Sequence, residues 1–378
     1  MTSQQLLKYF ESRLDHMIAS MTEIVEIESP SLNVAGNKAV VGWIESELAK
    51  IGGDLSFEKK KADGFGEHII IRAFSSDQTP TLLLGHTDTV HPVGAKNDNP
   101  TRIENGRLYG CGVFDMKANI VVMLEALRFC EVTKQRPERP INVLLSCDEE
   151  VGSPTGRLLV EREAANAERC FVFEPSFNGS VKTSRKGTAM YTLHAHGIPS
   201  HAGLEPEKGA NAILELARHF VHLDALNEPE LGTTVNVCTM KGGTTSNVIP
   251  EFAECEIDVR FSTMDEAKRV ENAIRSIRAI DERVNIEITG EINRPPMERT
   301  NAVVALYEQA RETAASFDYE LGEKQVGGAS DGNFVAALGV PVLDGLGITG
   351  DGAHTLHEYI DISDIVKRAT LVTKMLCR

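Results

Sequence analysis

The first half of the chain alternates short apolar runs with segments whose apolar residues recur at helical spacing. The apolar runs predict buried strands, and they cover residues 68–74, 81–84, 141–146 and 170–173. Helices are predicted over residues 117–131 and 153–165. This alternation is typical of an α/β fold with a mostly parallel sheet, in which active sites gather at the carboxyl ends of the strands.

Beyond residue 182 the pattern changes to strand, helix, strand, strand, helix, strand. The six elements are predicted over residues 188–196, 210–223, 233–240, 254–261, 265–280 and 284–292. This βαββαβ order is a ferredoxin-like α+β unit, and helix, strand and helix follow it. We therefore predict an insertion: residues 1–182 and 297–378 form one discontinuous domain, and residues 183–296 form a smaller one whose sheet has edges available for pairing.

Composition and charge narrow the class of protein. A content of 42% hydrophobic and 25% charged residues is ordinary for a globular protein, and a net charge of -16 argues against a nucleic-acid partner. The sequence contains no apolar stretch of about 20 residues, which a membrane helix requires, and residues 1–17 lack a signal-peptide core. The seven scattered cysteines suit reduced thiols. We therefore expect a cytoplasmic protein without a membrane or nucleic-acid partner.

Candidate chemistry begins where the apolar run 81–84 ends. His86 follows it, and Asp88 lies two residues further on. A metal-bound imidazole usually donates its second ring N–H to a carboxylate, so Asp88 is a candidate orienting partner for a ligand at His86. The alternative is that both residues cap a turn.

Two further segments offer carboxylates. Asp115 lies in a glycine-rich loop before a predicted helix, where it is either a metal ligand or a helix N-cap. The run Asp148-Glu149-Glu150 follows a buried strand. Adjacent side chains diverge, so one glutamate could bind a metal while its neighbour transfers a proton. The alternative is a solvated acidic loop.

Glu174 ends a fourth apolar run, and the segment 350–359 supplies one more imidazole, from His354 or His357. Two histidines and three carboxylates on loops of one sheet make a mixed nitrogen and oxygen site that suits zinc. Five ligands exceed a closed structural zinc site. Two metals fit better if Asp115 bridges them and each receives one histidine, one terminal carboxylate and a water.

With these motifs in place, the chain resembles the dizinc family of glutamate carboxypeptidase, acetylornithine deacetylase, succinyl-diaminopimelate desuccinylase and aminoacylase. The catalytic-domain motifs are His86-Thr-Asp88-Thr-Val, Gly110-Cys-Gly-Val-Phe-Asp115-Met-Lys, Asp148-Glu149-Glu150-Val-Gly-Ser, Phe173-Glu174-Pro and Gly352-Ala-His354. The segments Gly197-Ile-Pro-Ser-His201-Ala-Gly, Gly209-Ala-Asn-Ala and Gly242-Gly-Thr-Thr-Ser-Asn247-Val-Ile-Pro resemble the family's lid or dimerisation domain. The glutamate carboxypeptidase branch is the most similar.

The resemblance implies a role for each of these residues. Asp115 bridges two zinc ions, His86 and Glu174 complete one of them, and Glu150 and His354 complete the other. His354 is chosen over His357 because the Gly-Ala-His phrase matches the family. Glu149 is implied as general base, Asp88 as a residue behind the ligands, and His201 as a donor to the developing oxyanion. Cobalt or manganese could replace zinc.

For substrate binding the resemblance offers Asn247, Arg294, Ser330, Asp331 and Lys186. A guanidinium at Arg294 could clamp a substrate carboxylate, unless it pairs with a surface acid.

We therefore expect hydrolysis of an amide or peptide bond next to a free carboxylate, in a small molecule or short peptide. The first alternative is an N-acyl amino acid deacylase. The second, of another class, is a non-catalytic amino-acid-binding homologue. A homodimer through the inserted domain is also expected.

Overall fold

The computed structural model describes residues 2–377, and the chain divides into two compact units. Unit 1 is built from the chain up to Ser184, from Arg299–Gln325 and from the chain after Ala329. Unit 2 comprises Arg185–Glu298 and Val326–Ala329. The sequence predicts an insertion over residues 183–296. Compared with unit 2, this predicted range begins and ends two residues earlier, and it does not include the short segment 326–329.

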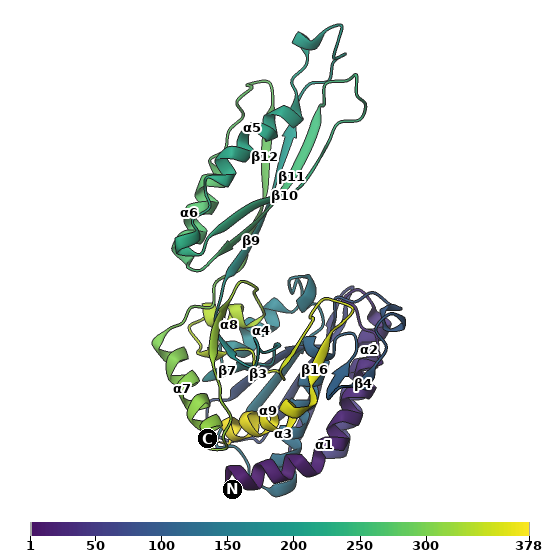
Figure 1. Cartoon of the computed structure of the whole chain (residues 1–378). Helices are drawn as coiled ribbons and strands as arrows, with labels where there is room; N and C mark the ends of the chain where they lie inside the picture. The colour runs from purple at the N-terminus through teal and green to yellow at the C-terminus, as the bar shows by residue number, and fades with distance from the viewer. Residues whose placement is uncertain (1, 378) are drawn as a thin grey trace. The chain divides into compact units, whose positions relative to one another are not determined.

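A six-stranded sheet organises unit 1 (Figure 1). Its order is β1-β2-β6-β3-β7-β14, and the strands are β1 (Leu55–Ala62), β2 (Gly66–Ala73), β6 (Ile141–Ser146), β3 (Thr81–His86), β7 (Arg169–Val172) and β14 (Val342–Leu343). Strands β6, β3, β7 and β14 run parallel, whereas β1 and β2 pair antiparallel. The prediction of an α/β fold with a mostly parallel sheet is confirmed.

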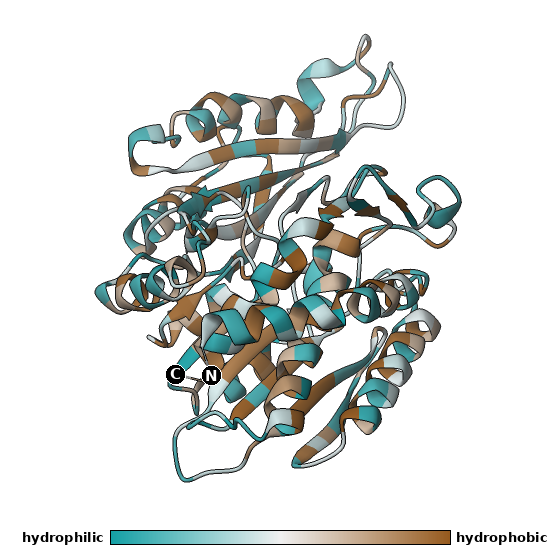
Figure 2. Cartoon of the chain, turned by 60° about the horizontal axis from the view of Figure 1, so that its bottom comes forward, coloured by the Kyte–Doolittle hydropathy of each residue, from teal (hydrophilic) through white to brown (hydrophobic). Residues whose placement is uncertain are grey.

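Helices cover this sheet because its central strands are apolar on both faces. Alternate strand residues such as Leu83 and Val143 join a core with residues of five helices. These helices are α1 (Ser3–Val25), α2 (Val34–Ile51), α3 (Ala118–Thr133), α7 (Asn301–Ala315) and α9 (Ile362–Leu376). The shorter helices α4 (Arg157–Ala164) and α8 (Gly332–Ala337) contact each other and strands of the same sheet. In Figure 2 these strands are mostly brown and the helices carry both colours.

Smaller sheets of unit 1 hold two loops together. The strands β15 (Gly350–Asp351), β16 (Tyr359–Asp361), β5 (Arg107–Tyr109) and β4 (Arg102–Glu104) form a four-stranded sheet in that order. Because β16 pairs with β5, the segment before β16 lies against the loop that follows β5. Gly110 N–H donates to the backbone carbonyl of Glu358 at 3.2 Å across this contact. A two-stranded sheet joins β8 (Val181–Arg185) and β13 (Glu323–Val326).

Unit 2 has the βαββαβ element order. Its elements are β9 (Gly187–His196), α5 (Ala212–Asp224), β10 (Thr234–Gly242), β11 (Phe252–Phe261), α6 (Met264–Arg275) and β12 (Asn285–Arg294). The antiparallel sheet has the order β10-β11-β9-β12. Both helices cover one face of it (Figure 1), where Tyr191 and Leu193 are buried, while Met190, the residue before Tyr191, is 60% exposed on the other face. Strands β10 and β12 are the two edges.

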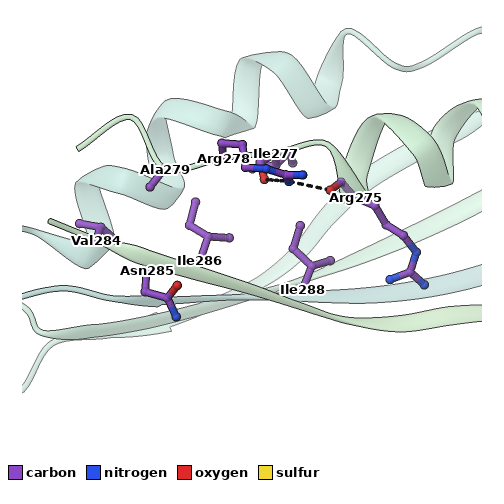
Figure 3. Close-up of a pocket in the computed structure, with 8 residues that line it drawn as sticks. All are labelled: Arg275, Ile277, Arg278, Ala279, Val284, Asn285, Ile286 and Ile288. Carbon is purple, nitrogen blue, oxygen red and sulfur yellow. Dashed lines mark hydrogen bonds between the residues drawn. The ribbon is translucent and has the colours of Figure 1, made fainter. Parts of the chain in front are cut away.

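Helix α6 ends five residues before the predicted end at residue 280. The chain leaves the helix because Ile277 turns into the core of unit 2 and the Glu215 carboxylate accepts the N–H groups of Ile280 and Asp281. A pocket of about 460 Å³ lies between this segment and β12 (Figure 3). Arg278 donates to the Arg275 carbonyl at its rim, at 2.9 Å. The pocket contains none of the predicted site residues.

Within residues 2–377, no helix combines the length and the apolar character that crossing a membrane requires.

Candidate active site

Three neighbouring parallel strands of unit 1 deliver candidate ligands at their carboxyl ends. His86 is the last residue of β3. Glu149 and Glu150 follow β6 in a short 3-10 turn, Glu149–Val151, and Glu174 lies two residues beyond β7. Since β6, β3 and β7 are parallel neighbours, their ends meet at one edge of the sheet. This edge therefore collects an imidazole and three carboxylates.

Asp115 lies between two histidines. Its Oδ1 is 3.1 Å from His86 Nε2, and its Oδ2 is 3.5 Å from His354 Nε2. The loop 113–117 carries Asp115 from β5 towards α3, while His354 comes from the loop between β15 and β16. One carboxylate thus faces two imidazoles with its two oxygens. Both candidate histidines are exposed, and His354 is the one whose Nε2 lies beside Asp115.

Each histidine has a second carboxylate beside it. His86 Nε2 lies 3.5 Å from Glu174 Oε1, and His354 Nε2 lies 3.3 Å from Glu150 Oε2. Donor atoms of His86, Asp115 and Glu150 all lie within 4.8 Å of one another, as do those of His86, Glu149 and Glu174. We call the six residues the donor cluster: His86, Asp115, Glu149, Glu150, Glu174 and His354.

The donor cluster has the chemistry of a metal site. Glu150 Oε1 is buried and has no hydrogen-bond partner among the described residues, which is costly for a carboxylate oxygen unless a cation faces it. His86 Nδ1 donates to the backbone carbonyl of Asp88 at 3.0 Å, so a neutral His86 would present the lone pair of Nε2 to the cluster. Imidazole nitrogen with carboxylate oxygen suits zinc and neighbouring divalent ions.

Proton affinities reflect the crowding of charge. Hydrogen bonds with Asp115 and Glu150 raise the pKa of His354 to about 10. Burial lowers the pKa of His86, but hydrogen bonds to Asp115 and Asp88 and the charge of Glu174 outweigh it, and the pKa lies well above its usual value. Burial raises the pKa of Glu150. For Asp115, burial is outweighed by both histidines, and its pKa is lowered. A metal ion binding here would displace protons from the imidazoles.

Asp88 lies directly behind the donor cluster. Its carboxylate accepts from Ser31 Oγ at 2.7 Å and from the N–H groups of Glu149 and Glu150 at 3.3 and 3.2 Å. His86 Nδ1 lies 3.0 Å from the backbone carbonyl of Asp88 and 3.5 Å from its carboxylate, so the carbonyl makes the stronger contact. The side chain of Asp88 therefore positions the acidic loop, and its backbone carbonyl positions the imidazole.

Glu358 is a buried residue that sequence reasoning missed. It is 0% exposed, and its carboxylate accepts from the N–H groups of Gly112 at 2.6 Å and of Phe114 and Asp115 at 2.8 Å. His91 Nε2 donates to it at 2.8 Å. Glu358 thus holds the backbone that carries Asp115. The run 350–359 is recognisable by its histidines, but no periodicity in it indicates which polar residue is buried.

Two predicted substrate residues of unit 1 are engaged inside the protein. Ser330 is 0% exposed and donates to Asp344 at 2.8 Å. Asp331 is 4% exposed and accepts from Ser146 Oγ at 2.9 Å and from Ser153 Oγ. Substrate contact by either residue stays a prediction.

The other predicted residues belong to unit 2. His201 is exposed, and its Nδ1 accepts from the N–H groups of Gly203 and Leu204 at 3.2 and 3.1 Å. The Asn247 carbonyl accepts from Ala202 N–H at 2.9 Å, which joins the two loops 198–203 and 242–250. Arg294 is the last residue of β12 and is 8% exposed, and Lys186 N–H donates to the Val326 carbonyl. Their roles stay predictions.

The fold and the donor cluster define an α/β protein with a candidate metal centre at the carboxyl edge of its sheet. Residues 82–378 match the model of "Peptidase family M20/M25/M40", and the chain belongs to this family. It is therefore a metal-dependent hydrolase, and the resemblance inferred from the motifs is confirmed.

Individual proteins place the chain among peptidases and deacylases. Carboxypeptidase G2 of Pseudomonas sp. (strain RS-16) is 28% identical over 374 residues, 95% of this chain and 88% of that protein. Succinyl-diaminopimelate desuccinylase of Thioalkalivibrio sulfidiphilus is 30% identical, with 79% and 84% covered. The fold matches aminopeptidase PepT from Bacillus cereus with a TM-score of 0.77 and 21% identity, covering 96% of this chain and 98% of that one. It also matches the M20 family metallo-carboxypeptidase Sso-CP2 from Sulfolobus solfataricus (TM-score 0.74, 16% identity, 96% and 98% covered).

Proposed function

We propose that the protein is a glutamate carboxypeptidase-like enzyme that hydrolyses an amide or peptide bond next to a free carboxylate. The observation that carries the proposal is Asp115, whose two oxygens face two separate pairs of donors, His86 with Glu174 and His354 with Glu150. Similarity to carboxypeptidase G2 over 95% of the chain favours this type of substrate.

The donor cluster would hold two divalent cations, with Asp115 between them. We propose zinc as the metal, and cobalt or manganese as substitutes, because the ligands are imidazole nitrogens and carboxylate oxygens. Bound cations of this kind lower the pKa of a water molecule and polarise a carbonyl group.

Glu149 is the proposed general base. It is 8% exposed, and its carboxylate lies within 4.8 Å of the donor atoms of His86 and Glu174. It can therefore reach a water held in the donor cluster. Its carboxylate takes a proton from the attacking water and then delivers it to the leaving nitrogen, so that it acts first as base and then as acid. Asp88 keeps Glu149 in place by accepting its backbone N–H at 3.3 Å.

Substrate recognition is assigned to unit 2 and to the Ser330-Asp331 segment. Arg294 would bind the free carboxylate of the substrate with its planar guanidinium, which matches a carboxylate with two hydrogen bonds. Asn247 is a further candidate for a polar contact, Lys186 is a weaker candidate for binding the carboxylate, and His201 would donate to the developing oxyanion. Substrates are therefore small molecules or short peptides with a free carboxylate.

A deacylase acting on an N-acyl amino acid is the second candidate. Several succinyl-diaminopimelate desuccinylases are 28–30% identical to the chain over 75–91% of its length. Both activities break an amide bond with the same donor cluster, and they differ in the acyl group and amino acid recognised. A non-catalytic amino-acid-binding homologue would not require Glu149 together with five ligand residues.

We further propose a cytoplasmic enzyme that forms a homodimer through unit 2. The cysteines of the chain are all reduced, which suits the cytoplasm. Strands β10 and β12 leave sheet edges at which a second copy can pair. Light scattering at micromolar concentration tests the dimer, and a strictly monomeric species would contradict it.

The experiment combines metal analysis with a substrate panel. The panel consists of a pteroyl or dipeptidyl glutamate, acetylornithine, succinyl-diaminopimelate and N-acetyl amino acids, each assayed with the zinc-loaded protein. Release of glutamate by a protein with two zinc ions per chain is the expected result. Turnover of one acylated amino acid instead would make the protein a deacylase, and absence of both metal and turnover would leave the binding protein.

A further inference from the structure

Two cysteines meet at the contact between α3 and α9, two helices that pack together in unit 1. Cys130 lies in the last turn of α3, and Cys377 immediately follows α9. Their sulfur atoms are 3.8 Å apart. All seven cysteines are reduced in the structure, and this pair joins residues that are 247 positions apart in the sequence.

The two thiols differ in their access to solvent. Cys130 is 0% exposed, whereas Cys377 is partly exposed. Cys377 lines a pocket of about 440 Å³ together with Leu6, Phe129, Lys134, Gln135, Arg136, Thr373 and Lys374. Cys130 does not line it. A small reagent that enters this pocket therefore meets Cys377 first.

Charges around the pocket do not oppose an anionic reagent. Lys134 pairs with Glu131, and Arg136 lies 3.4 Å from Glu131 and 3.3 Å from Asp54. Lys374 adds a third cation to the lining. Three cations and two neighbouring acids leave a small positive excess at the mouth of the pocket.

The contact between the sulfurs also divides their roles. The hydrogen bond between the two sulfurs lowers the pKa of Cys377, and together with burial it raises the pKa of Cys130. A thiolate is the nucleophilic form of cysteine. The exposed partner is therefore the nucleophile, and the buried partner is the thiol that reacts second.

We propose that Cys377 and Cys130 form a redox-active dithiol that closes to a disulfide on reaction with a small disulfide such as oxidised glutathione. The Cys377 thiolate attacks one sulfur of the reagent, forms a mixed disulfide and releases one thiolate. Cys130 then loses its proton to solvent and attacks Cys377 Sγ, which breaks the mixed disulfide and releases the second thiol. Two protein thiols are oxidised and one small disulfide is reduced to two thiols.

Closing the bond links the end of α9 to α3. The sulfurs must approach from 3.8 Å to about 2 Å, and Cys377 lies outside the helical part of α9, so its backbone can adjust. The link would constrain a very long loop of the unfolded chain. We expect the midpoint of thermal unfolding to rise by about 5 °C on oxidation.

The test starts from a Cys238→Ser protein, which lacks the exposed cysteine. This protein is incubated with oxidised glutathione, alkylated and mapped by mass spectrometry. The expected product has lost two hydrogens and yields a peptide pair joined through residues 130 and 377. An additional Cys130→Ala change should trap one glutathionyl group on Cys377, and a Cys377→Ala change should abolish both products.

Recovery of both thiols unmodified after this incubation would overturn the proposal. So would a glutathionyl group that accumulates on Cys377 while Cys130 is still present. Because Cys130→Ala empties a buried site, the mapping of the Cys238→Ser parent and its shift in unfolding midpoint give the answer even where that variant folds poorly. An unchanged midpoint in the oxidised parent would contradict the link between α3 and α9.

Discussion

The donor cluster of unit 1 and the 198–203 and 242–250 loops of unit 2 hold their polar side chains in different ways. His86 is 1% exposed at a strand end, and Glu358 accepts three N–H groups of the loop that carries Asp115. His201 and Asn247 are exposed, and their hydrogen bonds join neighbouring loop residues. The contrast shows a buried strand end and a loop held by a buried carboxylate in unit 1, and surface loops of a kind that tolerates variation in unit 2.

The largest effect is expected for Glu149→Gln. Removal of the general base should lower kcat about 10²–10⁴-fold, while the metal content stays that of the parent protein. Steady-state kinetics and metal analysis check this. Glu168→Gln, which changes a glutamate that is 51% exposed on the surface, is the matched control and should leave both quantities unchanged. A Glu149→Gln enzyme that retains its kcat would remove Glu149 from the mechanism.

A smaller effect, on metal affinity, is expected for Glu358→Gln. The amide replaces one carboxylate oxygen with an N–H donor, so it cannot accept from all three backbone groups, and the Asp115 loop should loosen. We expect metal affinity to fall about 10–100-fold, as for other residues behind metal ligands. Competition with a chelator measures it.

His91→Asn provides the comparison for Glu358→Gln. It removes the 2.8 Å hydrogen bond between His91 and the same carboxylate but leaves the three backbone contacts in place. The loss of metal affinity in His91→Asn should be clearly smaller than the loss in Glu358→Gln. Equal losses in the two variants would mean that the carboxylate does not act through the Asp115 loop.

In unit 2, Arg294→Lys should change substrate binding rather than turnover. Lysine keeps the charge but loses the two-pronged contact, and a hydrogen bond to a charged group contributes roughly 1.5–3 kcal/mol, so KM should rise about tenfold or more. Because the donor cluster is unchanged, kcat should stay close to that of the parent. The control is Arg260→Lys. In the parent protein, the Arg260 side chain pairs with Asp258 at 2.7 Å. A loss confined to kcat would contradict a binding role.

The smallest effect concerns stability of unit 1 in acid. Asp364 accepts from Thr349 N–H and Tyr319 OH, both at 2.7 Å. Burial raises its pKa, but the charge of Arg368 and these hydrogen bonds outweigh it, and the pKa is lowered. A lowered pKa stabilises the folded state above the ordinary value of 3.8, and this contribution is lost as the pH falls below it.

Replacing Asp364 by Asn should therefore cost about 1–3 kcal/mol near neutral pH, and the difference from the parent should shrink in acid. Urea unfolding at pH 7 and below pH 4 measures it. Asp63→Asn, at a side chain that is 84% exposed, is the control. A difference that stays constant with pH would show that Asp364 contributes through packing alone.

The sequence placed part of the donor cluster at the carboxyl edge of the sheet because its residues lie in recognisable places, and their roles stay predictions. His86, Glu149 and Glu174 follow apolar runs, and the strand predicted over residues 141–146 coincides with β6. A parallel sheet then brings these ends together. Periodicity and position were sufficient for this part of the site and for the element order of unit 2.

Other features depend on contacts between distant segments, which no local pattern contains. Glu358 and the Asp115 loop are more than 240 residues apart, as are Cys130 and Cys377. The Asp88 carboxylate accepts hydrogen bonds from Ser31 and the acidic loop, whereas the Asp88 backbone carbonyl accepts from His86. The early end of α6 depends on Glu215 in another helix. Tertiary hydrogen bonds decided all of these.

The central claim is that Asp115 joins two metal ions, and metal stoichiometry tests it most directly. Wild-type protein and the Asp115→Ala variant are loaded with zinc and freed of excess metal. Their zinc content per chain is then measured by elemental mass spectrometry. We predict about two zinc ions per wild-type chain and at most one, with no turnover, in the variant. One ion in a fully active wild-type protein, or two ions retained by Asp115→Ala, would contradict the account.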